Sequence, residues 1–282
     1  MVGNIKEKDM NDVQVTTEME ALKAKLGATW QAGDFSEIAS AIARGATEFV
    51  SRLPIQPGDR VLDIACGNGN TVIPAARAGA AVTGIDIAPY LIEQVKQRAR
   101  SEGIVAKFDV GDAEALPYSA SSFDVVLTMF GAMFAPRPNV VVSEMVRACR
   151  MGGTIAMANW TPAGFIGQMF KTTGKYLSPP AGIPSPLLWG DEDTVRERLS
   201  HVGELKMKRR MIEFDFPFGP NDVVEHFRRF YGPTLIAFEI LDPESRSALR
   251  NDLIDLWTTN NTSEDGSTSV LAEYLEIMVT RD

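Results

Sequence analysis

The stretch VLDIACGNGN, Val61–Asn70, decides how this chain is expected to fold. It begins as an apolar strand, reaches a carboxylate at Asp63 and ends in a loop that contains Gly67 and Gly69. Glycines directly after a strand let the backbone approach a ligand closely, and many ligands bound in this way carry phosphate. Asp63 needs a separate explanation, because a carboxylate beside such a loop repels phosphate.

Strands and helices alternate on both sides of this loop. The strand candidates are short, continuous apolar runs, which are typical of a parallel sheet covered by helices on both faces. They span residues 60–65, 81–86, 105–110, 123–129 and 152–159, and helices fit residues 70–79, 89–102 and 137–149. The sequence therefore predicts an α/β fold with a Rossmann-like, mostly parallel sheet.

The segments around this core give the expected domain organisation. A charged, flexible tail is expected at residues 1–14, followed by N-terminal helices from Thr16 to Leu53 that break at QAGDF. Residues 15–282 are expected to form one domain with a mainly helical cap over the open end of the sheet. Its core is predicted at residues 55–160, 191–216 and 268–282, and its cap insertions at 161–190 and 217–267.

Composition excludes several classes of protein. The net charge of −9 over 282 residues argues against broad contact with nucleic acid or an anionic membrane. Two histidines, two cysteines and no CxxC pair predict no metal site. The start of the chain lacks the apolar core of a secretion signal, and no apolar run approaches about 18 residues, so a cytoplasmic protein is expected. The oligomeric state stays open.

Acidic residues recur where three successive strands end. Asp63 lies near the end of the first strand, Asp86 closes the second and Asp112 follows the third. Aspartate is also common at turns and caps, but the repetition at one sheet edge favours a ligand site. Asp86 is placed to accept both ribose hydroxyls of a nucleoside, and Asp112 to accept from an adenine amino group, with Ala113 leaving room for the ring.

Asp63 separates two kinds of nucleotide ligand. The dinucleotide fingerprint GxGxxG places pyrophosphate at a helix N-terminus, but here Val72 stands where the third glycine would be. At an effective dielectric near 20, like charges about 5 Å apart cost roughly 3 kcal/mol, so Asp63 disfavours pyrophosphate. The same carboxylate attracts a cation. S-adenosylmethionine, a nucleoside with an ammonium and a sulfonium in place of phosphates, fits this position.

VLDIACGNGN, GIDIAP, GDAEALPYSASSFDVVLTMF and EMVRACRMGGTIAMANW together resemble, in order and spacing, the motifs of class I S-adenosylmethionine-dependent methyltransferases. The match covers about residues 55–160, and the flanking segments resemble members that act on small molecules. The resemblance implies a seven-stranded sheet whose last strand, EYLEIMVTR, runs antiparallel. The cofactor residues that it implies, with Trp30 from the N-terminal segment, are Asp63, Ala65, Cys66, Gly67, Asn68, Gly69, Asp86, Ile87, Asp112, Ala113, Met129 and Phe130. Ala65 departs from the family, in which glycine is frequent at this position.

Aromatic residues gather in the variable segments and favour an apolar or aromatic acceptor pocket. The candidates for that pocket are Phe134, Trp160, Phe165, Phe227, Phe230 and Tyr231. His226, at the edge of the apolar face of a helix over residues 221–231, is the candidate general base. A histidine there is also typical of an ordinary surface position. We expect His226→Ala to lower turnover more than cofactor binding.

The main prediction is methyl transfer from S-adenosylmethionine to an oxygen, nitrogen or carbon atom of a small molecule. The acceptor, the methylated atom and the use of a base are left open. An RNA or protein methyltransferase is one alternative, and the acidic charge and internal cap argue against it. A non-catalytic cofactor-binding protein is another. A NAD-dependent oxidoreductase is disfavoured by Asp63 and the absent third glycine.

Overall fold

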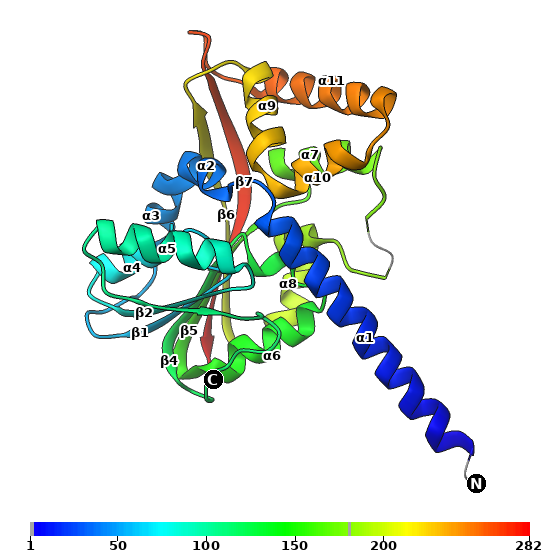
Figure 1. The fold of residues 1–282 in the computed structure, drawn as a ribbon. Coiled ribbons are helices and arrows are strands. Elements are labelled where there is room, and N and C mark those ends of the chain that lie inside the picture. Colours follow the sequence, from blue (N-terminus) through cyan, green and yellow to red (C-terminus); the bar gives the residue numbers. More distant parts are fainter. Residues whose placement is uncertain (1–2, 180–181) are drawn as a thin grey trace.

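The computed structural model describes residues 3–179 and 182–282, and only the helical backbone of residues 3–16. The strands form one seven-stranded sheet in the order β3-β2-β1-β4-β5-β7-β6 (Figure 1). Their bounds are β1 (Arg60–Ile64), β2 (Ala81–Asp86), β3 (Lys107–Val110), β4 (Phe123–Met129), β5 (Cys149–Trp160), β6 (Gly203–Phe216) and β7 (Thr268–Arg281). Strands β1–β5 are parallel, and β7 is antiparallel to both β5 and β6. The predicted sheet with an antiparallel last strand is confirmed.

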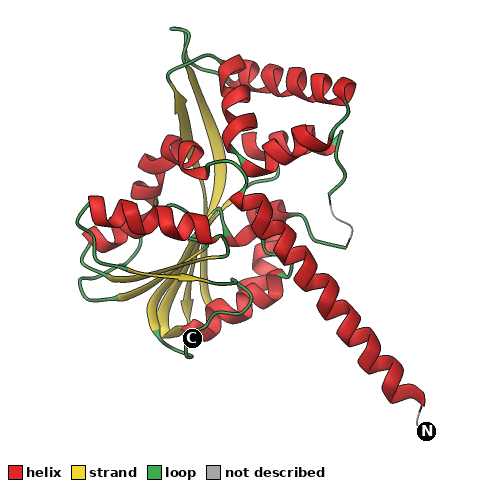
Figure 2. Ribbon diagram, in the orientation of Figure 1, coloured by secondary structure: helices red, strands yellow, loops and turns green. Residues whose placement is uncertain are grey.

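Helices cover both faces of this sheet (Figures 1 and 2). Helices α3, α4 and α5 lie on one side, and α6 and α8 on the other. The helices are α1 (Gly3–Gln31), α2 (Phe35–Ala39), α3 (Ala43–Ser51), α4 (Val72–Arg77), α5 (Pro89–Ser101), α6 (Pro138–Ala148), α7 (Phe165–Gly174), α8 (Glu192–Leu199), α9 (Pro220–Phe230), α10 (Gly232–Ile240) and α11 (Pro243–Asn260). Short 3₁₀ turns occur at η1 (Ser40–Ile42), η2 (Ala132–Phe134) and η3 (Pro186–Gly190).

The central strand β1 shows why continuous apolar runs predict the strands of a covered parallel sheet. Val61, Leu62 and Ile64 are fully buried because β1 pairs with β2 on one side and β4 on the other. The chain order reverses between β1 and β4, so the crossover helices leave in opposite directions and a crevice opens at the carboxyl ends of these strands. The motif VLDIACGNGN therefore lies at the switch point, where the strand order of the sheet reverses.

The N-terminal segment is more helical than the sequence predicts. Helix α1 begins at Gly3, so residues 3–14 of the expected tail are helical, and residues 1–2 lie outside the described residues. The predicted break at QAGDF is confirmed, since Gly33 has φ +77° and the Asp34 side chain caps α2 by accepting from the Ser36 N–H. The Asp34 N–H donates to the Phe230 carbonyl, which ties this break to α9.

The segments predicted as cap insertions contain α7, α9, α10 and α11, which lie together beyond one end of the sheet (Figure 1). Trp257 of α11 is buried and lies at their centre, with its ring centroid 4.5 Å from Phe165 and 5.3 Å from Phe227. Residues 180–181 of the first insertion lie outside the described residues. No helix within the described ranges has both the length and the apolar character needed to cross a membrane.

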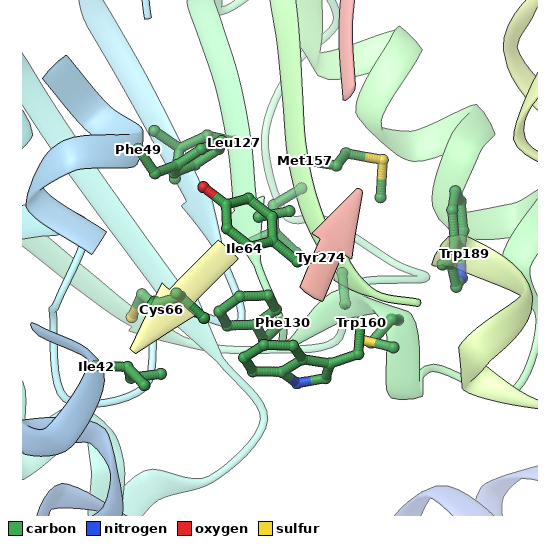
Figure 3. Close-up of a cluster of buried hydrophobic side chains, with 14 of the residues drawn as sticks. Ile42, Phe49, Ile64, Cys66, Leu127, Phe130, Met157, Trp160, Trp189 and Tyr274 are labelled. Carbon is green, nitrogen blue, oxygen red and sulfur yellow. The ribbon is translucent and has the colours of Figure 1, made fainter. Parts of the chain in front are cut away.

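A stacked aromatic pair lies in the core under the carboxyl ends of β4 and β5. The rings of Phe130 and Trp160 are nearly parallel, with centroids 3.5 Å apart, and Tyr274 of β7 meets Phe130 edge-on (Figure 3). On the same strand as Tyr274, the buried Glu276 is paired with Arg52 and Arg210, which ties α3 and β6 to β7. The pairing compensates the cost of burying these charges.

Candidate functional site

A cavity opens at the carboxyl ends of β1–β4, where the strand order reverses. Its empty space is about 1090 Å³ with the open mouth included. The β1–α4 loop, the end of β2 and the segment after β4 form three walls, and α1 crosses the fourth side with Lys23, Leu26 and Trp30. Eleven of the thirteen predicted cofactor residues line the cavity, the exceptions being Asp63 and Gly69.

The glycines of the first loop are required by its backbone. Gly67 and Gly69 have φ angles of +52° and +89°, which residues with a Cβ rarely adopt. A Cβ at Gly69 would also lie 2.5 Å from a methyl group of Val95 on α5. The Gly69 N–H donates to the Cys66 carbonyl at 2.9 Å and closes a tight turn. Gly69 therefore shapes the loop and is not itself among the cavity-lining residues.

Ala65 carries backbone strain at the point where β1 enters the loop. Its φ is +56°, a left-handed conformation in which alanine is less stable than glycine. The neighbouring Gly131, after β4, approaches so closely that a Cβ there would lie 2.5 Å from the Cβ of Ala65. The structure thus explains why glycine is frequent at position 65 in the family that the sequence resembles.

We expect Ala65→Gly to stabilise the ligand-free protein by about 1 kcal/mol, because glycine removes the left-handed penalty. Urea unfolding of the purified chain measures the change. Ala78→Gly is the matched control, since Ala78 is exposed at the C-cap of α4 with φ −74° and should gain nothing. Equal or lower stability of Ala65→Gly would show that the strain is not relieved by glycine.

Asp86, at the end of β2, organises the loop and faces the cavity. Its carboxylate accepts from the Gly67 N–H and the Ala88 N–H, both at 2.9 Å. Burial raises the pKa of this carboxyl above its ordinary value, and the backbone N–H groups partly oppose the rise. Each oxygen keeps a second lone pair for a ligand donor. Asp86 is therefore where the sequence predicts it, with an added structural role.

Asp63 lies behind the loop and is almost completely buried. Thr71 donates a hydrogen bond to its Oδ2, while Oδ1 has no hydrogen-bond partner among the residues that the structure describes. Burial and the nearby charge of Asp86 raise the pKa of Asp63 to about 7. Asn68, which does line the cavity, also has a buried side-chain oxygen without a partner in the described part of the chain. Unpaired buried acceptors are costly, so this end of the cavity suits a ligand with N–H or O–H donors and positive charge.

Asp112 lines the cavity, but its surroundings differ from the sequence prediction. Lys23 of α1 lies 2.5 Å from Asp112 Oδ2 and 2.5 Å from Glu114 Oε2, and Arg137 pairs with Glu114 at 2.7 Å. Asp112 Oδ1 accepts from the Glu114 N–H. Asp112 is therefore a paired carboxylate and not a free one. Sequence reasoning missed Lys23, although Lys23, Leu26 and Trp30 are spaced to share one face of a helix.

The predicted acceptor pocket is only partly right. Phe134 lines the cavity beside Trp30, with ring centroids 4.9 Å apart, and Phe35, which the sequence analysis did not include, completes this wall. The other predicted side chains stand behind the wall. Trp160 stacks under Phe130, Phe165 and Phe227 pack on Trp257, Tyr231 backs Trp30 and Phe35, and Phe230 lies against His226. The sequence does not separate these residues from the cavity lining, because a single sequence does not show which face of a cap helix turns inward.

His226 also lies away from the cavity. Its ring packs among Phe216, Phe218 and Phe230, and its Nε2 is 3.4 Å from the Glu37 carbonyl oxygen. The structure does not place it among the cavity-lining residues. This position is the one expected of an ordinary surface histidine, and it gives no support to a role of His226 as general base.

Comparisons with known proteins agree with this geometry. A family model described as a methyltransferase domain matches residues 62–157, which run from β1 to β5. An uncharacterised protein of Mycobacterium tuberculosis is 38% identical over 246 residues, covering 86% of this chain and 90% of that protein. The YcgJ protein from Bacillus subtilis shares the fold, with a TM-score of 0.58 over 85% of this chain and 99% of that one, at 16% identity.

One further relative has a named reaction. The 27-O-demethylrifamycin SV methyltransferase of Amycolatopsis mediterranei is 35% identical over 131 residues, which cover 44% of this chain and 48% of that enzyme. The strand order with an antiparallel β7, the glycine loop and the matched domain all lead to the same assignment. The chain belongs to the class I S-adenosylmethionine-dependent methyltransferase family.

Proposed function

We propose that this protein transfers a methyl group from S-adenosylmethionine to a small, apolar or aromatic acceptor. The observation that carries the proposal is that the cavity has two kinds of lining. One is the acidic and polar lining of Asp86 and Asn68, with Asp63 behind the loop, and the other is the aromatic lining of Trp30, Phe35 and Phe134. A nucleoside with a cationic amino-acid part matches the first lining, and an apolar acceptor matches the second.

The residues present fit this cofactor. Asn68 and the backbone of residues 65–67 would hold the amino-acid part, where Asp63 and Asn68 have unpaired oxygens. Asp86 would accept from the ribose hydroxyls, and Ala113 would pack against the base beside Asp112. When bound, the cofactor supplies a methyl group on a sulfonium, an activated leaving group that departs as a neutral thioether.

The contribution of the chain is positioning and the exclusion of water. Within the described residues, the titratable side chains at the cavity wall are Lys23, Cys66, Asp86 and Asp112. Burial, together with the charges of Asp63 and Asp86, raises the pKa of Cys66 well above its ordinary value, so the thiol stays protonated and is a poor nucleophile. We infer that the acceptor atom itself attacks the methyl group as the bond from methyl to sulfur breaks, and that a hydroxyl acceptor releases its proton to solvent at the open mouth of the cavity. Trp30, Phe35 and Phe134 would hold the apolar body of the acceptor.

The related rifamycin methyltransferase supports a small-molecule acceptor, because its name describes a small natural product methylated on oxygen. The acidic net charge of −9 supports the same choice over RNA. We therefore place a hydroxyl group on an apolar molecule first among acceptors, with nitrogen and carbon nucleophiles next.

Calorimetric titration with S-adenosylmethionine, S-adenosylhomocysteine and NAD(H) in parallel tests the cofactor. We expect the first two to bind at one site per chain and NAD(H) to give no heat. Binding of NAD(H) alone would overturn the proposal. Labelled cofactor offered with bulk tRNA and with a panel of phenols, alcohols and amines tests the acceptor. Incorporation into tRNA but not into the panel would replace the small-molecule assignment, and a protein that binds cofactor but labels nothing would favour a non-catalytic role.

Once the panel has given an acceptor, His226→Ala should turn over like the wild type, because the imidazole is not at the cavity. Initial rates at saturating cofactor measure this, with Phe134→Ala as the comparison that removes a cavity wall. A fall in turnover for His226→Ala at unchanged cofactor affinity would restore the base role that the sequence predicts.

A further inference from the structure

The part of the cavity beside Asp112 and Ala113, called here the nucleobase end, is closed by a network of ion pairs that runs from α1 to the segment after β3. Lys23 approaches Asp112 and Glu114 at 2.5 Å each, and Glu114 also accepts from the Arg137 side chain at 2.7 Å and from the Arg137 N–H at 2.6 Å. The Glu114 side chain is fully buried, and the Lys23 side chain is 15% exposed. Two cations and two carboxylates balance, so the group is neutral overall.

This neutrality distinguishes the two ends of the cavity. At the loop end, Asp63 and Asp86 accept hydrogen bonds from Thr71 and from backbone N–H groups, and no ion pair with either aspartate occurs within the described residues. A cationic amino-acid part is attracted to Asp63 and Asp86. An uncharged nucleobase would gain no such attraction from Asp112 and Glu114 without their cations. By neutralising these two carboxylates, Lys23 makes the nucleobase end suitable for an uncharged base.

Lys23 also fixes the helix that covers the cavity. Lys23, Leu26 and Trp30 lie on one face of α1 and line the cavity, and Figure 1 shows the C-terminal end of α1 against the rest of the chain while its N-terminal part projects away. Trp30 anchors one end of this stripe by edge-on contacts with Phe134 and Tyr231. Lys23 anchors the stripe two turns earlier, across the position of Asp112 and Ala113.

We propose that Lys23 is a cofactor-positioning residue, which holds α1 across the nucleobase end of the cavity and keeps the Asp112 carboxylate beside the base. The inference rests on the proposed function, because it takes the bound nucleoside to be that of S-adenosylmethionine. It adds a residue of the N-terminal helix to the site that the β1 loop and the strand ends form.

Titration with S-adenosylhomocysteine tests the role with the full chain and three variants. Lys23→Met should raise Kd at least tenfold, because Asp112 and Glu114 lose their shared cation. Helix α1 also loses its ion pairs at the nucleobase end and is then held only by contacts such as those of Trp30. Lys23→Arg should recover most of the affinity, since it restores the charge. Lys25→Met is the matched control, because Lys25 is exposed on the same helix and is not among the cavity-lining residues, and its Kd should stay within twofold of wild type.

A loss of folding must be separated from a loss of positioning. The double variant Lys23→Met with Glu114→Gln removes one charge of each sign, so its melting temperature should return toward wild type while its Kd stays at least tenfold raised. Hydrogen exchange gives a second readout: bound S-adenosylhomocysteine should protect the amides of residues 17–31 in wild type but not in Lys23→Met.

Two results would overturn the inference: a Lys23→Met protein whose Kd lies within twofold of wild type, or a double variant whose affinity recovers with its stability. The second result would mean that Lys23 acts only through folding. Failure of the proposed function looks different, because wild type itself would then bind neither S-adenosylmethionine nor S-adenosylhomocysteine.

Discussion

Asp86→Asn is expected to weaken binding of S-adenosylmethionine by roughly 10- to 150-fold. The carboxylate lies at the cavity wall and fixes the loop through the Gly67 and Ala88 N–H groups. A hydrogen bond to a charged group contributes about 1.5–3 kcal/mol, and a ribose hydroxyl would lose that partner. The neutral amide also removes negative charge from the end of the cavity that faces the cationic amino-acid part.

Calorimetry gives the affinity, and thermal unfolding of the ligand-free protein gives the stability. Asp193→Asn is the control, because the Asp193 side chain is 95% exposed on α8 and its loss should change neither quantity. An unchanged Kd in Asp86→Asn would remove Asp86 from the ligand site and leave it as a loop-organising residue. A melting temperature lowered in step with the affinity would indicate that the loop, and not the ligand contact, was lost.

The second large effect is expected from pH acting through Asp63. Its pKa is raised to about 7 by burial and by Asp86, so the carboxyl is mostly protonated at pH 6 and mostly ionised at pH 8. A cationic ligand binds the ionised form, and cofactor affinity should therefore rise about tenfold from pH 6 to pH 8. Asp63→Asn should bind weakly and lose this rise, and comparing the two proteins cancels any titration of the ligand itself.

The stability of the ligand-free protein should change in the opposite direction. Asp63 has a higher pKa in the folded chain than the ordinary value of 3.8, so the folded state holds a proton that the unfolded chain releases. Its favourable contribution is complete below about pH 4 and is lost as the pH rises through 7. Melting temperatures of wild type relative to Asp63→Asn should fall across this window, and bound cofactor should offset the fall at pH 8. A difference that does not vary with pH would contradict the raised pKa.

The strand-end residues of the site could be predicted because their placement follows from a local rule. Once β1, β2, β3 and β4 are recognised as parallel neighbours, their carboxyl ends must meet at one edge, and Asp86, Asp112 and Met129 go there with them. The first loop is equally local, since the φ angles of Gly67 and Gly69 concern only the chain next to them. Even the atypical Ala65 could be identified from the motif alone, before its φ of +56° was known.

The acceptor side could not be predicted in this way. Phe227, Tyr231 and His226 share helix α9 and its C-cap, and their roles depend on how that helix rotates against Trp257 and the α1–α2 turn. Amphipathic spacing gives the buried face of a helix but not its partner. The same limit applies to Lys23, whose partners Asp112 and Glu114 lie about ninety residues further along the chain.

The sequence alone predicts the mostly parallel sheet, the ligand loop after β1 and a positively charged ligand at that loop. Each of these depends on backbone conformation or burial within a few residues or between neighbouring strands. Packing in three dimensions sets three further positions: Lys23 of α1 pairs with Asp112 at the cavity wall, Phe35 lines the wall with Trp30 and Phe134, and His226 lies away from it. Those outcomes depend on packing between segments far apart in the chain, where the buried area and the pairing of charges determine which face of each helix turns inward.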